Sequence, residues 1–188
     1  METVVARKKM MDWNVLAIVH QGRFSEAIKI LKEFGPVQRS RFYNVLELKV
    51  ANTKELLERM RLKFEENPGM RSIFSRILPV EMAFAFSTKE EFEKKAAESV
   101  KAFLNDLRGK SFHVRIHRRG FKERLSSPEE ERSLDRLLIE ELEKAGSPGR
   151  IDFDDPDAIL AVETLGNRAG LALWRREDRA LCPFFRIE

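Results

Sequence analysis

Basic side chains crowd one short segment of the chain, residues 108–124. The segment holds seven basic residues against one acidic residue, and the basic ones are Arg108, Lys110, Arg115, Arg118, Arg119, Lys122 and Arg124. Positive charge at this density favours a phosphate backbone, by Coulomb attraction and by release of its counterions. Arginine outnumbers lysine here, and the planar guanidinium suits bidentate phosphate contacts and stacking on bases. The segment therefore predicts a nucleic-acid partner.

An acidic segment follows at residues 129–144, with seven acidic and three basic residues. Further positive charge returns near the end of the chain, at Arg168, Arg175, Arg176 and Arg179. A second interpretation is therefore open: the arginines of residues 108–124 form ion pairs with the acidic segment and otherwise lie on a solvated face. Charge alone does not choose between the two.

Two of the three histidines, His113 and His117, lie four residues apart in a segment of alternating apolar and polar residues. This alternation predicts a strand over residues 112–117 with its apolar side chains inward and its basic or histidine side chains outward. Along a strand that spacing is about 13 Å, too long for both histidines to bind one metal ion. Beside Arg115, they could contact phosphate or stack on bases, or they could be ordinary surface residues.

Four aspartates, Asp152, Asp154, Asp155 and Asp157, surround Pro156. Paired carboxylates could hold Mg²⁺ or perform acid–base chemistry. The segment lacks the ligand spacing of a calcium loop, and aspartate next to proline is ordinary turn chemistry. We therefore expect a structural turn in which Asp157 bonds neighbouring backbone.

Other kinds of reactive site find no support in the sequence. It contains no phosphate-binding loop, dinucleotide fingerprint or nucleophile elbow. The single cysteine, Cys182, excludes an intramolecular disulfide and a cysteine-rich zinc site, and its surroundings predict an inert, buried thiol. We expect no cofactor and no bound metal.

The composition is that of a globular protein: 188 residues, 43% hydrophobic and 35% charged, with a net charge of +4. This length predicts one domain or two small ones, able to fold without disulfides or metal. Apolar runs are shorter than a membrane span, and residues 1–12 lack a secretory pattern. We expect a cytoplasmic protein without a membrane partner.

The elements that position these side chains fall into two groups. In the first half, the pattern predicts a strand at Val15–Val19, a helix ended by Gly35-Pro36, a strand from Val45, a helix capped by Asn52, and a strand at residues 72–77. With a short strand within residues 36–42, the order is β-α-β-β-α-β, the ferredoxin-like arrangement. We assign residues 1–79 to this module.

The second half, residues 80–188, has its own alternation of helices and strands. After the strand pattern at residues 80–86, a long helix is expected to carry a buried stripe from Phe92 to Leu107. Ser127-Pro128 starts the next helix, Ala158–Val162 is apolar throughout as in a strand covered by helices, and Gly166–Gly170 makes a hairpin turn. The fold class is α/β (α+β).

Several motifs of this second half, in this order, resemble those of THUMP domains. Phe112–Gly120 is similar to that family's strand with trailing basic residues, and the capped helix from Pro128 follows as in the family. Ile151–Asp157 is similar to its V-D-L-x-x-P-D stretch, and Ala158–Gly166 to its apolar strand ending near glycine. The resemblance covers residues 80–188, and the family usually places a ferredoxin-like module before this domain.

The resemblance implies binding of tRNA, with the acceptor end as target. THUMP domains hold the substrate in tRNA-modifying enzymes, and in non-catalytic adaptors that help an acetyltransferase make N4-acetylcytidine. Because the sequence stops soon after the domain, it is most similar to the adaptor type, so we expect no enzyme activity and an RNA-modifying partner such as an RNA acetyltransferase. The family's positions imply roles for Arg115, Arg118, Arg119, Asn167 and Arg168. Local charge and position add His117, Lys122, Arg124 and Arg175.

Two other functions are compatible with the sequence. The ferredoxin-like pattern also occurs in small-molecule-sensing or oligomer-forming modules that bind no RNA, in which sheet edges could pair to form a homo-oligomer. Such a module has no need of the basic segment 108–124. A stand-alone enzyme using the Asp152–Asp157 cluster would require a metal ion for turnover.

Overall fold

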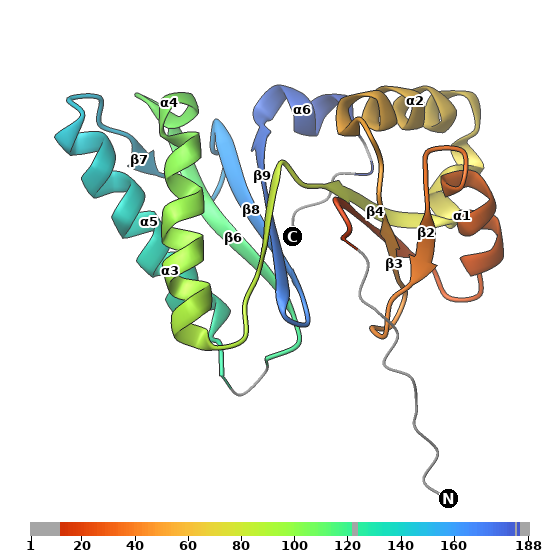
Figure 1. The fold of residues 1–188 in the computed structure, drawn as a ribbon. Coiled ribbons are helices and arrows are strands. Elements are labelled where there is room, and N and C mark those ends of the chain that lie inside the picture. Colours follow the sequence, from red (N-terminus) through yellow and green to blue (C-terminus); the bar gives the residue numbers. More distant parts are fainter. Residues whose placement is uncertain (1–11, 122–123, 183, 185–188) are drawn as a thin grey trace, which may run out of the picture.

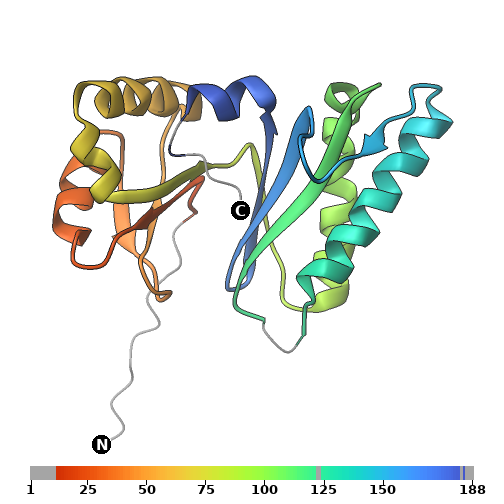
Figure 2. The same cartoon turned by 180° about the vertical axis from the view of Figure 1, so that it is seen from behind.

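The computed structural model describes residues 12–121, 124–182 and 184. Two sheets lie side by side at the centre, with helices on their outer sides (Figures 1 and 2). Within the described ranges, no helix is both long and apolar enough to cross a membrane. The predicted α+β class is confirmed.

The first sheet belongs to the β-α-β-β-α-β module that the pattern predicts. Its elements are β1 (Val15–Val19), α1 (Phe24–Leu31), β2 (Val37–Arg39), β3 (Val45–Leu48), α2 (Thr53–Glu66), the 3-10 helix η1 (Pro68–Ser72) and β4 (Phe74–Pro79). The strands pair antiparallel in the order β2-β3-β1-β4, which is the ferredoxin-like order.

Local capping places the ends of α2 in this module. The Asn52 carboxamide oxygen accepts hydrogen bonds from the N–H groups of Lys54 and Glu55, at 3.0 and 3.2 Å. At the other end, the Asn67 side chain accepts from the Gly69 N–H at 3.0 Å and starts the 3-10 turn η1. The strand predicted from residue 72 therefore begins later, at Phe74.

The second sheet is mixed. Its module contains β5 (Met82–Ala85), α3 (Lys89–Val100), η2 (Lys101–Phe103), α4 (Leu104–Leu107), β6 (Ser111–Arg119), α5 (Ser127–Lys144), β7 (Arg150–Ile151), β8 (Ala158–Leu165), β9 (Arg168–Arg175) and α6 (Arg176–Leu181). The strand order is β5-β9-β8-β6-β7; β6 runs parallel to β7 and β8, and the other pairs are antiparallel. The single helix expected up to Leu107 is interrupted by η2.

The centre of the larger sheet is buried on both faces. One face packs on α3 and α5 through a core that includes Phe112, Val114 and Ile116. The other face meets the first module: Ala172 and Trp174 join the core of that module. All eight residues of β8 are buried in consequence. The apolar run Ala158–Val162, which lies in β8, was expected to be covered by helices. Helices cover only one face of the strand, and the first module covers the other.

A third apolar cluster lies between the two sheets. It is formed by Trp13, Leu16, Val45, Leu78, Val80 and Leu165. Gly170 on β9 lies against it, and a Cβ there would come within 2.7 Å of Val80 Cγ1 and 3.0 Å of the Trp13 ring. The two modules thus meet through apolar contacts in two clusters. The division of the chain into domains at residues 79 and 80 stays a prediction.

The aspartate-rich segment is a structural turn, as expected. Asp152 Oδ1 accepts hydrogen bonds from the N–H groups of Asp154 and Asp155, at 3.0 and 3.2 Å. Asp157 Oδ2 accepts from the Ser111 N–H and from its hydroxyl, both at 2.9 Å. These Ser111 bonds lower the pKa of Asp157. Asp157 therefore joins the first residue of β6 to the start of β8.

The close fit at Gly170 can be tested by filling it. Gly170→Ala should lower the free energy of unfolding by about 1–3 kcal/mol, the usual cost of overpacking. Urea denaturation followed by the fluorescence of the buried Trp13 and Trp174 measures this. Adding Val80→Ala should recover part of the loss, because it removes the obstructing methyl groups. Strictly additive effects of the two substitutions would contradict this packing.

Candidate nucleic-acid interface

The strand β6 sends alternate side chains to opposite faces of the sheet. Phe112, Val114 and Ile116 point into the core under the helices. Arg118 continues this series at the end of the strand, where the core gives way to solvent, and its Nη1 donates to the Gly120 carbonyl at 3.0 Å. The alternation thus places Arg118 under the start of α5.

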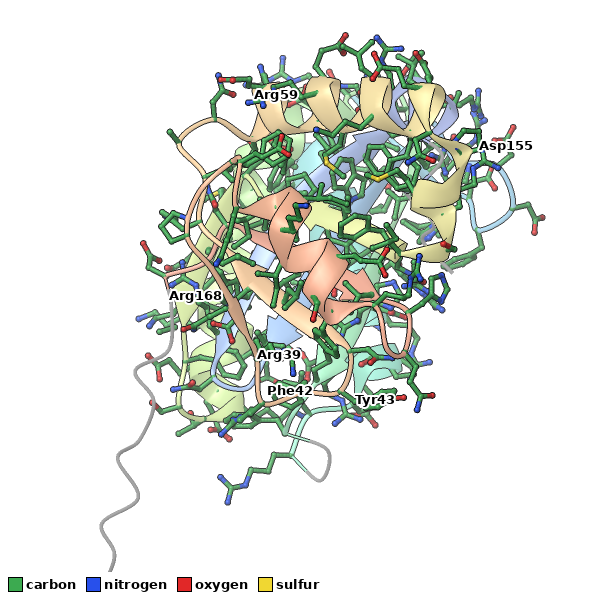
Figure 3. The ribbon with its side chains drawn as sticks, turned by 90° about the vertical axis from the view of Figure 1, so that its right-hand side faces the viewer. Arg39, Phe42, Tyr43, Arg59, Asp155 and Arg168 are labelled. Atoms are coloured by element: carbon green, nitrogen blue, oxygen red, sulfur yellow. The ribbon has the colours of Figure 1, made fainter. Side chains whose placement is uncertain are left out.

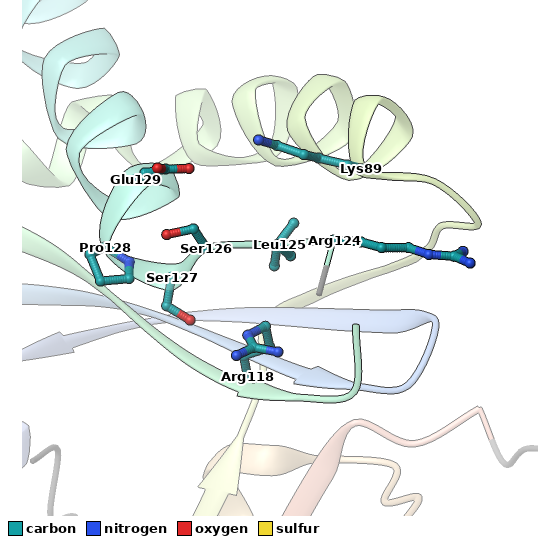
Figure 4. A pocket seen from close by; sticks show the side chains of 8 residues that line it. All are labelled: Lys89, Arg118, Arg124, Leu125, Ser126, Ser127, Pro128 and Glu129. Carbon is teal, nitrogen blue, oxygen red and sulfur yellow. The ribbon is translucent and has the colours of Figure 1, made fainter. Parts of the chain in front are cut away.

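A pocket of about 560 Å³ opens at this place (Figure 4). Its lining residues are Lys89, Arg118, Arg124, Leu125, Ser126, Ser127, Pro128 and Glu129. Lys89 begins α3, while Ser126 and Ser127 begin α5, so two helix starts and the end of β6 converge here. In Figure 4, Arg124 extends outward on the solvent side, and Arg118 lies beneath the first turn of α5.

The start of α5 adds a partial positive charge to this pocket. Sequence spacing put the cap at Ser127, but the N-cap is Ser126, and its side chain makes no capping hydrogen bond. The unpaired N–H groups of a helix start attract anions. Glu129 and Glu130 lie in the same turn, and Lys89 Nζ is 3.6 Å from Glu130. The pocket is therefore mixed in charge, with Arg118 and Arg124 supplying the excess of cations on its open side.

The opposite face of β6 is directed at the first module, and its charges are largely engaged. Arg119 Nη1 lies 2.8 Å from Oε2 of Glu163, which is 2% exposed. Burial raises the pKa of Glu163 to about 7, although Arg119 opposes the shift. Burial, together with Arg76 and Arg115, lowers the pKa of His117 to about 4, so that His117 is uncharged at neutral pH.

His113, predicted to face outward, is buried instead. It is 8% exposed, and its Nδ1 lies 2.8 Å from the Asp152 carbonyl oxygen, to which it donates. The alternation of the strand was correct, but the first module and the Asp152 turn cover this face of the sheet. The sequence pattern had no signal for that cover.

Acidic residues of α5 bond the backbone of β6 rather than its arginines. On the edge that β7 occupies only at Ser111 and Phe112, the Val114 N–H donates to Asp135 Oδ1 and the Ile116 N–H donates to Glu131 Oε1, both at 2.7 Å. Arg115 is 4.0 Å from Glu131 and 44% exposed. The ion-pairing interpretation therefore accounts for little of the basic segment.

The remaining predicted residues lie in different places. Gly166 and Asn167 form the turn between β8 and β9, which is shorter than the predicted turn over Gly166–Gly170 and lies next to Gly120. Arg168 is the first residue of β9 and pairs with Asp12. Arg175 lies at the opposite end of the sheet, where it bonds Asp106 at 2.6 Å. Lys122 lies outside the described residues. We call Arg118, Arg119, Gly120, Arg124 and residues 166–168 the basic end.

The structure also brings residues to the basic end that the sequence analysis passed over. Besides Lys89, these come from the turn between β2 and β3. A Cβ on Gly166 would lie 2.6 Å from Arg41 Nη2, and one on Gly120 would lie 3.5 Å from the Phe42 ring. The feature of the sequence that could have identified these residues is the mixture of arginines and aromatic residues in Arg39–Tyr43.

Comparison with protein-family models and with curated protein sequences finds no match. Solved structures with a similar fold include PH1313 from Pyrococcus horikoshii OT3, with a TM-score of 0.57 and 14% identity over 86% of this chain and 54% of that one. TrmN from Thermus thermophilus has a TM-score of 0.57 and 20% identity, over 88% of this chain and 47% of its own.

A 4-thiouridine synthetase solved with RNA and ATP is similar at a TM-score of 0.54 and 16% identity, over 86% of this chain and 40% of its own. This chain spans about half the length of these proteins, or less. They are THUMP-domain proteins, and the likeness shows that the chain has a THUMP-like fold.

The carboxyl group of Asp135 in α5, which accepts a hydrogen bond from the edge of β6, makes the stability of the fold depend on pH. Burial raises the pKa of Asp135 from 3.8 to about 7, against the hydrogen bond from Val114. The folded state therefore favours the protonated form, and wild-type stability should fall relative to Asp135→Asn as pH rises from 3.8 through 7. Urea denaturation at several pH values measures the difference.

The control for this experiment is Asp135→Ala. It leaves the Val114 N–H without an acceptor, so we expect a loss of about 1–3 kcal/mol. A wild-type stability that keeps a constant offset from Asp135→Asn at all pH values would contradict the assigned burial of the carboxyl group.

Proposed function

We propose that this chain is a tRNA-binding protein whose basic end contacts phosphates. The observation that carries the proposal is the placement of Arg118 and Arg124 beside the start of α5 in an open pocket. Charged donors at a helix start suit phosphate oxygens. The fold shared with a synthetase solved in complex with RNA supports the same conclusion.

Recognition would use shape and backbone more than sequence. RNA helices are contacted mainly through phosphates and 2′-hydroxyl groups, because side chains cannot read their deep major groove. Arg118 and Arg124 serve as phosphate contacts in this proposal, and Asn167 is exposed on the adjacent turn. Arg119 holds the strand end through Glu163 and acts by position rather than by contact.

We further propose that the chain is a non-catalytic adaptor in the cytoplasm. It would present the acceptor end of tRNA to an acetyltransferase that makes N4-acetylcytidine. Two groups in the sequence that could perform catalysis are engaged in the structure in other ways. Asp152 and Asp157 accept hydrogen bonds from backbone N–H groups, and burial raises the pKa of the Cys182 thiol to about 11. This supports a role in which the chemistry belongs to a partner.

The phosphate contacts are tested with Arg118→Ala combined with Arg124→Ala. We expect weaker binding to total tRNA, and a slope of log affinity against log salt that falls by about one unit per lost contact. The matched control is Arg108→Ala combined with Arg150→Ala, which removes two exposed arginines at the other end of β6 and β7. Equal losses in both pairs would mean that net charge, not this site, determines binding.

A sensing or oligomerisation module without RNA binding would show no preference for tRNA over duplex DNA of equal length across the salt series. The adaptor role is tested separately in cells. Deleting the gene should remove N4-acetylcytidine from tRNA, and re-expression should restore it, whereas the Arg118/Arg124 variant should restore less. Unchanged N4-acetylcytidine after deletion would rule out the adaptor role and leave RNA binding standing.

A further inference from the structure

The turn between β2 and β3 presents one strongly exposed aromatic residue. Tyr43 is 74% exposed, the highest value among the large hydrophobic side chains exposed in the described part of the chain. It stands in the first module, outside the THUMP-like segment that suggested RNA binding. Figure 3 shows it at the same end of the molecule as Arg39 and Phe42.

Hydrogen bonds hold this turn in one conformation. The Ser40 hydroxyl oxygen accepts from the Phe42 N–H at 2.9 Å, and the Ser40 N–H donates to the Val45 carbonyl at 3.0 Å. Asn44 adopts φ 58°, and its carbonyl accepts from the Val19 N–H at 2.9 Å. The backbone under Tyr43 is therefore ordered before any partner arrives, which lowers the entropic cost of binding.

The turn between β2 and β3 contacts the basic end. Phe42 packs against the third cluster and reaches Gly120, while Arg41 lies over Gly166. The approach is close at both glycines: a Cβ on Gly120 would lie 3.1 Å from Gly166 Cα, and a Cβ on Gly166 would lie 2.6 Å from the end of the Arg41 side chain. Contacts of the Arg41 and Phe42 side chains thus place the turn that carries Tyr43 at the strand end that carries Arg118 and Arg119.

The charge around Tyr43 indicates what kind of partner it fits. Arg39 and Arg41 are exposed on either side of Ser40, and Arg41 lies over the Phe42 ring at 5.2 Å. The other strongly exposed aromatic residue, Phe153 at 69%, lies beside Asp152 and Asp154, so its surroundings repel phosphate. An exposed ring in a segment that also carries two exposed arginines fits a nucleotide, whose base stacks on the ring while its phosphates meet the guanidinium groups.

We propose that Tyr43 is a stacking platform for one unpaired base of the bound RNA, with Arg41 contacting the adjoining phosphate. This inference rests on the proposed RNA-binding function and extends its surface from the second module to the first. A duplex has no unpaired base to offer, so the platform makes the protein prefer RNA with a single-stranded extension. The phosphate contacts of the basic end serve both kinds of RNA.

The chain contains a single tyrosine, which allows a direct test. Protein grown with 3-fluorotyrosine gives one ¹⁹F resonance, from Tyr43. The probes are a blunt RNA duplex and the same duplex with a short 3′ single-stranded extension, and binding is measured independently by filter retention. We expect both RNAs to bind and only the extended one to shift the ¹⁹F resonance strongly.

Substitution supplies the second readout. Tyr43→Ala should weaken binding of the extended RNA by roughly 5- to 150-fold, the range typical for one stacked base, and leave the blunt duplex almost unchanged. Tyr43→Phe should retain binding, because the ring remains. Phe153→Ala is the matched control, an equally exposed aromatic ring on the acidic turn, and should change neither RNA. Fluorescence of the buried Trp13 and Trp174 verifies folding of each variant.

The alternative outcomes are distinct. If both RNAs bind without a ¹⁹F shift and Tyr43→Ala binds the extended RNA like wild type, the platform is wrong and the proposed function stands. If neither RNA binds, both proposals fail together. If the resonance responds only to a protein partner such as the acetyltransferase, the turn is a protein-docking surface and the inference is overturned.

Discussion

The edge of β6 that faces away from β8 is completed by a helix instead of a strand. Two carboxylates of α5 accept the hydrogen bonds of Val114 and Ile116 that a neighbouring strand would otherwise accept. The spacing fits because residues four apart on a helix and two apart on a strand are both separated by about 6–7 Å. Unsatisfied N–H groups in this buried position would be costly, so α5 must carry hydrogen-bond acceptors there.

This constraint determines where the candidate site forms. With Glu131 and Asp135 held against β6, the start of α5 comes to lie over the end of the strand. Arg118 is the next residue on the helix-covered face, so it emerges beneath the first turn of α5. The pocket thus results from the way in which α5 accepts the hydrogen bonds of the β6 edge. The acidic segment interacts with the basic segment mainly through backbone N–H groups and not through ion pairs.

The second face of the larger sheet explains why neighbouring residues of one basic run behave so differently. The first module covers that face, so Arg119 must share it with Glu163, and His117 loses its charge by burial. Arg118, one position away, points to the open end instead. The same contact between modules seats the turn of Arg41 and Phe42 on Gly166 and Gly120. The contact with the first module therefore engages Arg119 and neutralises His117, and it brings Arg41 to the basic end.

The sequence by itself determined whatever depends on neighbours along the chain. Asn52 caps its helix, Asp152 closes its turn, and the alternation of residues 112–117 gives a strand, because these interactions span only a few residues. The β-α-β-β-α-β order of elements along the first module was predicted from signals of the same local kind. The sequence also carried the THUMP resemblance, which the fold bears out.

Only the tertiary structure decided which charges are engaged and which are open. Arg119 and Glu163 are 44 residues apart, and Arg175 lies at the far end of the sheet because β9 runs antiparallel to β8. His113 is buried by elements outside its own segment. Strand register, the cover on the second face and the seat of the Tyr43 turn arise from contacts between distant segments. A pattern read along the chain contains no measure of those distances.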